Sequence, residues 1–161
     1  MIKNKIFEKI KIKDTEFSNR IVVSPMCQYS AENGLMNDWH FQHLSQFGFS
    51  GAGSVMIEST AVENIGRITH NCTGIYDHDC LSSIKTTLEK VKALSLNEIK
   101  FGIQLGHAGR KASTQRPWEG RSYLRHNQNP WKTIAPSAIP FDKDWPIPVS
   151  YTHLRAHETI R

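Results

Sequence analysis

The amino-acid sequence predicts an α/β protein in which a parallel sheet is covered by helices. Three short apolar segments, at 21–24, 55–57 and 101–105, have the aliphatic, β-branched composition of buried strands. Two longer segments between them, at about 38–49 and 77–94, repeat apolar residues at the three- and four-residue spacing of amphipathic helices. Strands that alternate with helices in this way are typical of parallel sheets, because each crossover runs through a helix.

A hairpin and the first strand are expected at the start of the chain. Alternating apolar and polar residues at 10–17 surround an Asp14–Thr15 turn, which is the pattern of a short β-hairpin. The first buried strand then ends at Pro25, which lacks the N–H that a sheet ladder requires.

Each predicted helix has an acidic residue near its start. Asp38 is expected to cap the first helix, which a glycine-rich stretch ends near Phe49. Asp77 or Asp79 is expected to cap the second, which should reach about Leu94.

Two segments are predicted to lack regular structure. One is 62–76, and the other follows Gly106, where six prolines interrupt any helix or strand. Within the second, residues 149–161 resemble a translated sequencing-library adapter, so we interpret them as a non-native tail. The remaining residues, 1–148, are assigned to a single domain.

Composition and charge exclude several classes of protein. Hydrophobic residues make up 39% of the chain and charged residues 22%, which is typical of a soluble globular domain rather than a disordered one. The formal net charge of +5 is spread along the sequence, and no basic stripe or nucleic-acid module is visible. There is no apolar run of membrane-spanning length and no signal-peptide core, so we expect a cytoplasmic protein that binds neither nucleic acid nor membrane. The three cysteines lack metal-site spacing and are expected to be reduced thiols.

Polar and glycine-rich residues follow all three predicted strands. The segments 24–29, 58–61 and 104–111 each begin at or just beyond the end of a strand. Because the carboxyl ends of parallel strands carry the binding site in α/β folds, these segments should face one common mouth. The spacing predicts a cofactor or substrate site without identifying its ligand.

The residues in these segments are more specific than their spacing. Five strings occur in order: Ser24-Pro-Met-Cys-Gln-Tyr29, Gly66-Arg-Ile68, Gln104-Leu-Gly-His-Ala-Gly-Arg-Lys111, Arg116-Pro-Trp-Glu-Gly120 and Ala135-Pro-Ser-Ala138. Together they resemble the N-terminal region of the Old Yellow Enzyme family, the NADH:flavin oxidoreductases and NADH oxidases. The similarity covers about residues 5–148 and is greatest to the bacterial subclass of xenobiotic reductases and thermophilic-type ene-reductases.

The resemblance implies an incomplete (β/α)8 TIM barrel. Such a barrel has eight strand–helix units and about 250 residues, and the sequence supplies three units, an N-terminal hairpin and a long loop after the third strand. We therefore expect a truncated N-terminal part of an FMN-binding barrel. The proton-donating tyrosine and the pair of carbonyl-binding histidines of the family would lie beyond the truncation, so the fragment itself is expected to be inactive.

The resemblance also implies a chemistry. In this family NAD(P)H, as NADPH or NADH, reduces a bound FMN, which then passes hydride to an activated alkene such as an α,β-unsaturated carbonyl. The substrate would be a small electron-poor alkene, and the parent protein is expected to be a homo-oligomer. By similarity, the residues that contact FMN would be Ser24, Pro25, Met26, Cys27, Ser59 and Gln104, and Tyr29 would contact substrate. Ser59 departs from the family, which often has alanine there.

Several of these residues also have a purely structural interpretation. Cys27 taken alone would be a small buried apolar residue, and Tyr29 a half-buried aromatic. Gln104 is harder to explain by packing, because a buried amide without partners is costly. The segment 107–111 has basic groups that could contact a cofactor, contact a neighbouring subunit, or brace the loop.

Two histidines give rise to an alternative hypothesis. His40 and His43 are three residues apart on the first predicted helix, a spacing that can place two metal ligands on one face. The alternative function would be a metal-dependent barrel hydrolase. No third ligand follows at a supporting position, so packing or helix capping is the favoured interpretation. A truncated product with no independent activity is a further alternative.

Overall fold

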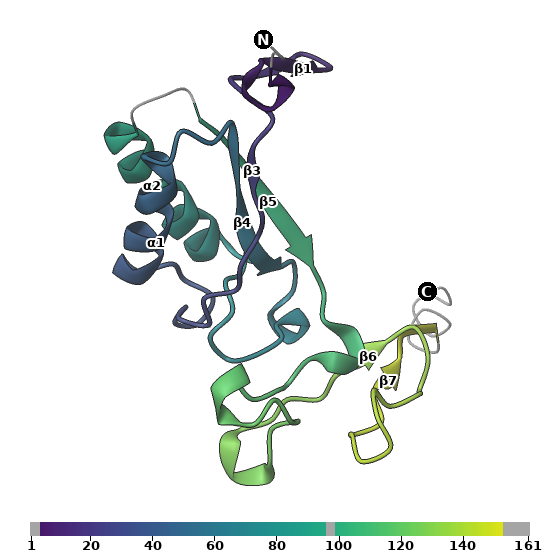
Figure 1. Ribbon diagram of the computed structural model, residues 1–161. Helices are drawn as coiled ribbons and strands as arrows, with labels where there is room; N and C mark the ends of the chain where they lie inside the picture. Colours follow the sequence, from purple (N-terminus) through teal and green to yellow (C-terminus); the bar gives the residue numbers. More distant parts are fainter. Residues whose placement is uncertain (1–3, 96–98, 153–161) are drawn as a thin grey trace, which may run out of the picture.

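A three-stranded parallel sheet forms the centre of the protein (Figure 1). The computed structural model describes residues 4–95 and 99–152. The sheet has the order β3 (Val22–Val23), β4 (Ser54–Ala61) and β5 (Lys100–Gly106), with β4 hydrogen-bonded to both neighbours. The predicted α/β class and strand–helix order are therefore confirmed. Within the described residues the sheet is open and does not close into a barrel.

Two helices, α1 (Asp38–Gly48) and α2 (His78–Leu94), lie together on one face of the sheet (Figure 1). Apolar residues of both helices interlock with the side chains of β4 and β5 that point toward them, and exclude water from between the layers. The buried members of this core are Met36, Leu44, Val55, Ile57, Ile84, Val91 and Ile99.

The helices begin where local side chains satisfy their first N–H groups. Asn37, rather than the predicted Asp38, caps α1, and its side-chain oxygen accepts from Trp39 N–H at 3.2 Å. Asp38 instead lies in the first turn, where a carboxylate is favoured by the helix dipole. Asp77 caps α2 as one of the two predicted candidates, accepting from Cys80 N–H at 2.7 Å.

The N-terminal hairpin packs near the end of the sheet at which the strands begin (Figure 1). After a short 3-10 turn, η1 (Lys5–Phe7), strands β1 (Ile10–Ile12) and β2 (Thr15–Phe17) pair antiparallel, as expected. The turn falls one residue earlier than predicted, at Lys13 and Asp14, since Ile12 pairs with Thr15, and Lys13 has a positive φ of 52°.

Strand β4 is longer than its apolar run of 55–57 predicts. It continues through Glu58 to Ala61 after an irregularity between Ile57 and Ser59, where β4 has one residue more than β5. The chain then enters the predicted loop, which contains one 3-10 turn, η2 (Asn64–Gly66). The sequence did not predict this extension because its residues are polar.

Beyond β5 the chain is largely irregular, as the prolines predict. It forms 3-10 turns η3 (Gly109–Lys111), η4 (Pro117–Glu119) and η5 (His126–Gln128) and an unpredicted parallel pair, β6 (Ile134–Ala135) with β7 (Val149–Ser150). Strand β7 lies at the start of the segment interpreted as a non-native tail. Residues 153–161 of that segment lie outside the described residues, so this interpretation stays a prediction. In the described part of the chain, neither helix has the length and apolar character needed to cross a bilayer.

Replacing a core leucine should destabilise the fold far more than replacing an exposed one. Leu44 on α1 is 4% exposed and Leu81 on α2 is 48% exposed. We expect Leu44→Ala to lower the free energy of unfolding by about 2–5 kcal/mol, because it leaves a cavity in the core. Leu81→Ala should change it by less than about 0.5 kcal/mol. Equal losses for the two variants in urea titrations would contradict the assignment of the core.

Candidate functional site

The carboxyl ends of the three strands meet, as the spacing of the polar segments predicts. Ser59 of β4 and Gln104 of β5 are direct partners in the parallel ladder. The Ser59 hydroxyl lies close over Gly106, only 3.0 Å from the position that a Cβ would take there. On the other side of β4, the Cys27 sulfur lies against the Ser59 backbone. The thiol at 27 and the amide at 104 therefore both adjoin Ser59, on one edge of the sheet.

The segment 24–29 that carries Cys27 is attached to β4 through Glu58. The Glu58 carboxylate is buried, and its Oε2 accepts a hydrogen bond from Gln28 N–H at 2.8 Å. Its Oε1 lies 3.2 Å from Nε2 of His40 on α1, at an angle too bent for a regular hydrogen bond. The register irregularity of β4 lies at this residue, and a bulge of this kind re-aims one side chain relative to the ladder. The sequence places Glu58 in the polar segment 58–61 but does not predict a role for it.

The Cys27 thiol is held in its protonated form. Burial is the largest cause and the Glu58 negative charge the next, and together they raise the pKa of Cys27 to about 11. Hydrogen bonds from the Ser59 backbone and the Tyr29 hydroxyl act in the opposite direction and lower this pKa. At neutral pH the group that adjoins the strand ends is consequently a neutral thiol and not a thiolate nucleophile.

Tyr29 adopts an unusual backbone conformation and packs against a distant loop. Its φ of 53° is in the left-handed region, which is uncommon for an aromatic residue. Its ring meets Trp118 of η4 edge-on, with the centroids 5.7 Å apart. Burial, followed by the neighbouring Cys27, raises the pKa of the Tyr29 hydroxyl. The loop after β5 thus folds back over the segment 24–29, a contact between residues 89 positions apart that no local pattern could reveal.

The other predicted cofactor residues are accessible at the same edge. Ser24 and Met26 are exposed and Pro25 is half-buried between them. Gln104 is exposed as well, and within the described residues nothing hydrogen-bonds its side-chain amide. Its donor and its acceptor are both available to a ligand.

The basic segment 107–111 braces the loop after β5. His107 Nε2 lies 3.1 Å from a Glu63 carboxylate oxygen, and its Nδ1 accepts from Gly109 N–H at 3.0 Å. Arg110 donates to the Ser137 hydroxyl at 2.9 Å, and the Lys111 ammonium lies over the ring of Phe141. Of the three roles left open by the sequence, the structure shows loop bracing.

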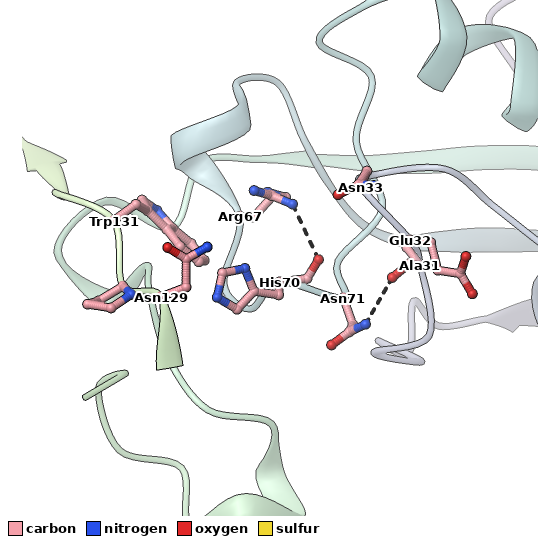
Figure 2. Close-up of a pocket in the computed structure, with 9 residues that line it drawn as sticks. Ala31, Glu32, Asn33, Arg67, His70, Asn71, Asn129 and Trp131 are labelled. Carbon is pink, nitrogen blue, oxygen red and sulfur yellow. Dashed lines mark hydrogen bonds between the residues drawn. The ribbon is translucent and has the colours of Figure 1, made fainter. Parts of the chain in front are cut away.

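A separate polar cavity of about 450 Å³ lies between three loops (Figure 2). Arg67 donates to the His70 carbonyl oxygen, and its guanidinium lies 5.3 Å from the centre of the Trp131 ring. The indole N–H of Trp131 donates to the Ile65 carbonyl oxygen at 2.9 Å. The Gly66-Arg-Ile68 string thus joins the loop after β4 to the loop after β5. Cys27, Ser59 and Gln104 do not line this cavity.

His40 and His43 are used in two different structural contacts. His40 caps the start of α1 by accepting from Asn37 N–H at 3.1 Å, as the capping interpretation predicts. His43 packs edge-on against Phe47 at 5.1 Å, and burial lowers the pKa of its ring. Within residues 4–95 and 99–152, no three side chains of the metal-binding types come together.

The raised pKa of Cys27 predicts slow reaction with alkylating agents near neutral pH. A shift from 9.0 to about 11 leaves about 100-fold less thiolate at pH 8. Peptide-resolved mass spectrometry of iodoacetamide-treated protein should give a rate for Cys27 that keeps rising up to pH 11. The same chain unfolded in guanidinium chloride is the control and should level off near pH 9. A native profile that levels off below pH 9 would show that the thiol is not shielded in this way.

Comparison with known proteins identifies the family to which this site belongs. Residues 5–138 match the sequence profile of the NADH:flavin oxidoreductase / NADH oxidase family. The chain is 37% identical over 159 residues to an NADPH dehydrogenase of Listeria monocytogenes, covering 98% of this chain and 42% of the relative. It is 38% identical over 152 residues to the NADH:flavin oxidoreductase FG08077 of Gibberella zeae, covering 92% of this chain and 36% of the relative.

Solved structures show the same fold. Old Yellow Enzyme from Pichia sp. superimposes with a TM-score of 0.70 at 19% identity, covering 96% of this chain and 40% of that protein. Morphinone reductase superimposes with a TM-score of 0.69 at 18% identity, covering 90% and 39% respectively. The chain thus spans about two fifths of the proteins that it matches. With its three-stranded start of a barrel and its matching profile, it belongs to the NADH:flavin oxidoreductase / NADH oxidase family, the Old Yellow Enzyme family of FMN-dependent enzymes.

Proposed function

We propose that the whole protein transfers hydride from NAD(P)H, through FMN, to a small electron-poor alkene such as an α,β-unsaturated carbonyl. One observation carries the proposal: Cys27 and Gln104, which follow or end two different strands, both adjoin Ser59 on the strand between them. In an α/β fold this is the edge at which ligands bind. Family membership supports FMN as the ligand, and the names of the relatives support NADPH or NADH as the reductant.

The residues at this edge fit a flat heteroaromatic ring. The pyrimidine part of a flavin has both hydrogen-bond donors and acceptors, and the free amide of Gln104 offers one of each. The segment 24–26 is accessible and can present backbone groups and the Met26 side chain to the ring. Ser59 differs from the alanine common in the family but keeps the same main-chain contact available. These residues would hold FMN, which when bound supplies the hydride-transfer chemistry.

The neighbouring residues would shape the environment of the cofactor. Cys27 would place an uncharged thiol beside the ring, where it can tune the electronics of the cofactor. Tyr29 would offer its hydroxyl to the substrate, and Trp118 supports the Tyr29 ring from the side. The flanking strands β3 and β5 each have one unpaired edge within the described sheet, which leaves room for the remaining strands of a barrel. We further propose that the whole protein is a cytoplasmic homo-oligomer.

Gln104 provides a direct test of the cofactor site. In the full-length protein, Gln104→Leu removes both hydrogen-bonding groups while nearly preserving volume. We expect it to weaken FMN binding by about 10-fold or more, since each lost hydrogen bond to a ligand costs about 1 kcal/mol. Gln46→Leu, on the exposed surface of α1, is the matched control. Fluorescence titration with FMN measures both, and equal affinities would argue against a contact between Gln104 and the flavin.

The proposed reaction predicts a two-step redox cycle. Under anaerobic conditions NADPH or NADH should bleach the flavin absorbance of the full-length protein, and 2-cyclohexenone should then restore it. An excess of EDTA should leave both steps unchanged, whereas a metal-dependent hydrolase would lose activity. Failure of every enone tested to restore the absorbance would defeat the assignment of an alkene substrate while leaving the flavin site intact.

A further inference from the structure

Glu58 is a buried carboxylate that the proposed function does not yet use. It is 5% exposed, and in the described residues no lysine or arginine forms an ion pair with it. Burying a carboxylate is costly unless hydrogen bonds or an opposite charge compensate. Its polar contacts are the Gln28 N–H at 2.8 Å and the His40 ring nitrogen at 3.2 Å.

His40 is held in place by Asn37 at the start of α1. Its Nδ1 atom lies 3.1 Å from the backbone N–H of Asn37 and 2.9 Å from the Asn37 side-chain oxygen. The opposite edge of the ring, with Nε2, faces Glu58. His40 therefore connects the first turn of α1 to the Glu58 carboxylate.

Glu58 therefore connects β4 to α1 and to the segment 24–29. It lies on β4, contacts α1 through His40, and holds the backbone of the residue that follows Cys27. The residue that follows Glu58 on β4 is Ser59, whose backbone contacts the Cys27 sulfur. The segment 24–29 and β4 are thus joined by two neighbouring contacts. One is between Gln28 N–H and the Glu58 carboxylate, and the other is between the Cys27 sulfur and the Ser59 backbone.

We propose that Glu58 is a positioning residue of the flavin site, which anchors the segment 24–29 to β4 and fixes the Cys27 thiol beside the cofactor. This inference rests on the proposed function for its relevance to flavin, but its geometry stands apart from any cofactor. The carboxylate has two effects, a mechanical one through Gln28 and an electrostatic one on Cys27.

The electrostatic effect is set by few groups. The titratable side chains that act on Cys27 are Glu58, Cys72 and Tyr29. Of these, the Glu58 negative charge has the largest effect and raises the pKa of the thiol, second only to burial. The other titratable groups near Glu58 are His40 and His43 of α1. Removing the charge at 58 should lower the pKa of Cys27.

The test is the pH profile of Cys27 alkylation in the full chain, made soluble by a cysteine-free fusion partner and used without flavin. Glu58→Gln keeps the length and the oxygen that accepts from Gln28 but removes the charge. We expect the midpoint of the alkylation profile of Cys27 to lie at a lower pH in this variant than in the unchanged chain. For each unit by which the pKa falls, the reaction at pH 8 should be about tenfold faster. Glu89→Gln, an exposed site on α2, is the matched control and should leave the midpoint unchanged. An unchanged midpoint in Glu58→Gln would overturn the electrostatic effect of Glu58 on Cys27.

A second variant keeps the proposal testable if Glu58→Gln does not fold. Cys72, which is 1% exposed, reports folding, because unfolding would make it react as fast as Cys27. Glu58→Asp retains the charge but is one methylene too short to reach both partners. In Glu58→Asp we expect Cys27 to be alkylated faster than in the unchanged chain at every pH, while Cys72 stays protected. If Cys27 is protected as well as in the unchanged chain, the anchoring role is refuted. Because both readouts are independent of flavin, a failure of the proposed function would show only in the FMN titration and the enone cycle.

Discussion

The register between β4 and β5 is the constraint on which the site depends. Ile57 faces Ile103, and after one extra residue Ser59 faces Gln104. Because side chains alternate between the faces of a strand, a slip of one residue would send Gln104 toward the helices and Phe101 away from them. The extra residue at Glu58 lets β4 keep its apolar residues in the core and still present Ser59 at the strand ends.

The helix-covered face and the two ends of this sheet have different roles. The face covered by α1 and α2 contains the continuous apolar core and supplies the stability. The end at which the strands begin is covered by the N-terminal hairpin, whereas the carboxyl end carries polar groups and accessible side chains. His40 and Glu58 lie where these regions meet, since His40 is in the first turn of a helix and Glu58 is a buried residue in the carboxyl-terminal half of a strand. The first turn of α1 is therefore coupled to the geometry of the candidate flavin site.

Sequence patterns predicted the parts of this structure that local chemistry determines. The order of strands and helices, the hairpin and the three polar strand ends follow from composition and spacing, and the structure has them all. The pair β6–β7, the contact of Tyr29 with Trp118 and the pairing of His40 with Glu58 join residues far apart in the chain. Nothing near Glu58 in the sequence reveals that the spare nitrogen of a capping histidine will face it. The i,i+3 pair of histidines invited a metal hypothesis for the same reason, because spacing shows which residues share a helix but not what opposes them.

The unfavourable placement of Glu58 is itself an argument about function. A well-packed apolar residue of similar volume often matches or exceeds the stability given by a buried charged group. The fold nevertheless holds a carboxylate beneath the surface next to Cys27, with a backbone N–H as its hydrogen-bond partner and the His40 ring 3.2 Å away. A lysine or arginine partner would stabilise the carboxylate but would cancel its field at the thiol. The backbone N–H of Gln28 holds the carboxylate in place, and the Glu58 charge adds to burial in raising the pKa of the neighbouring Cys27 thiol.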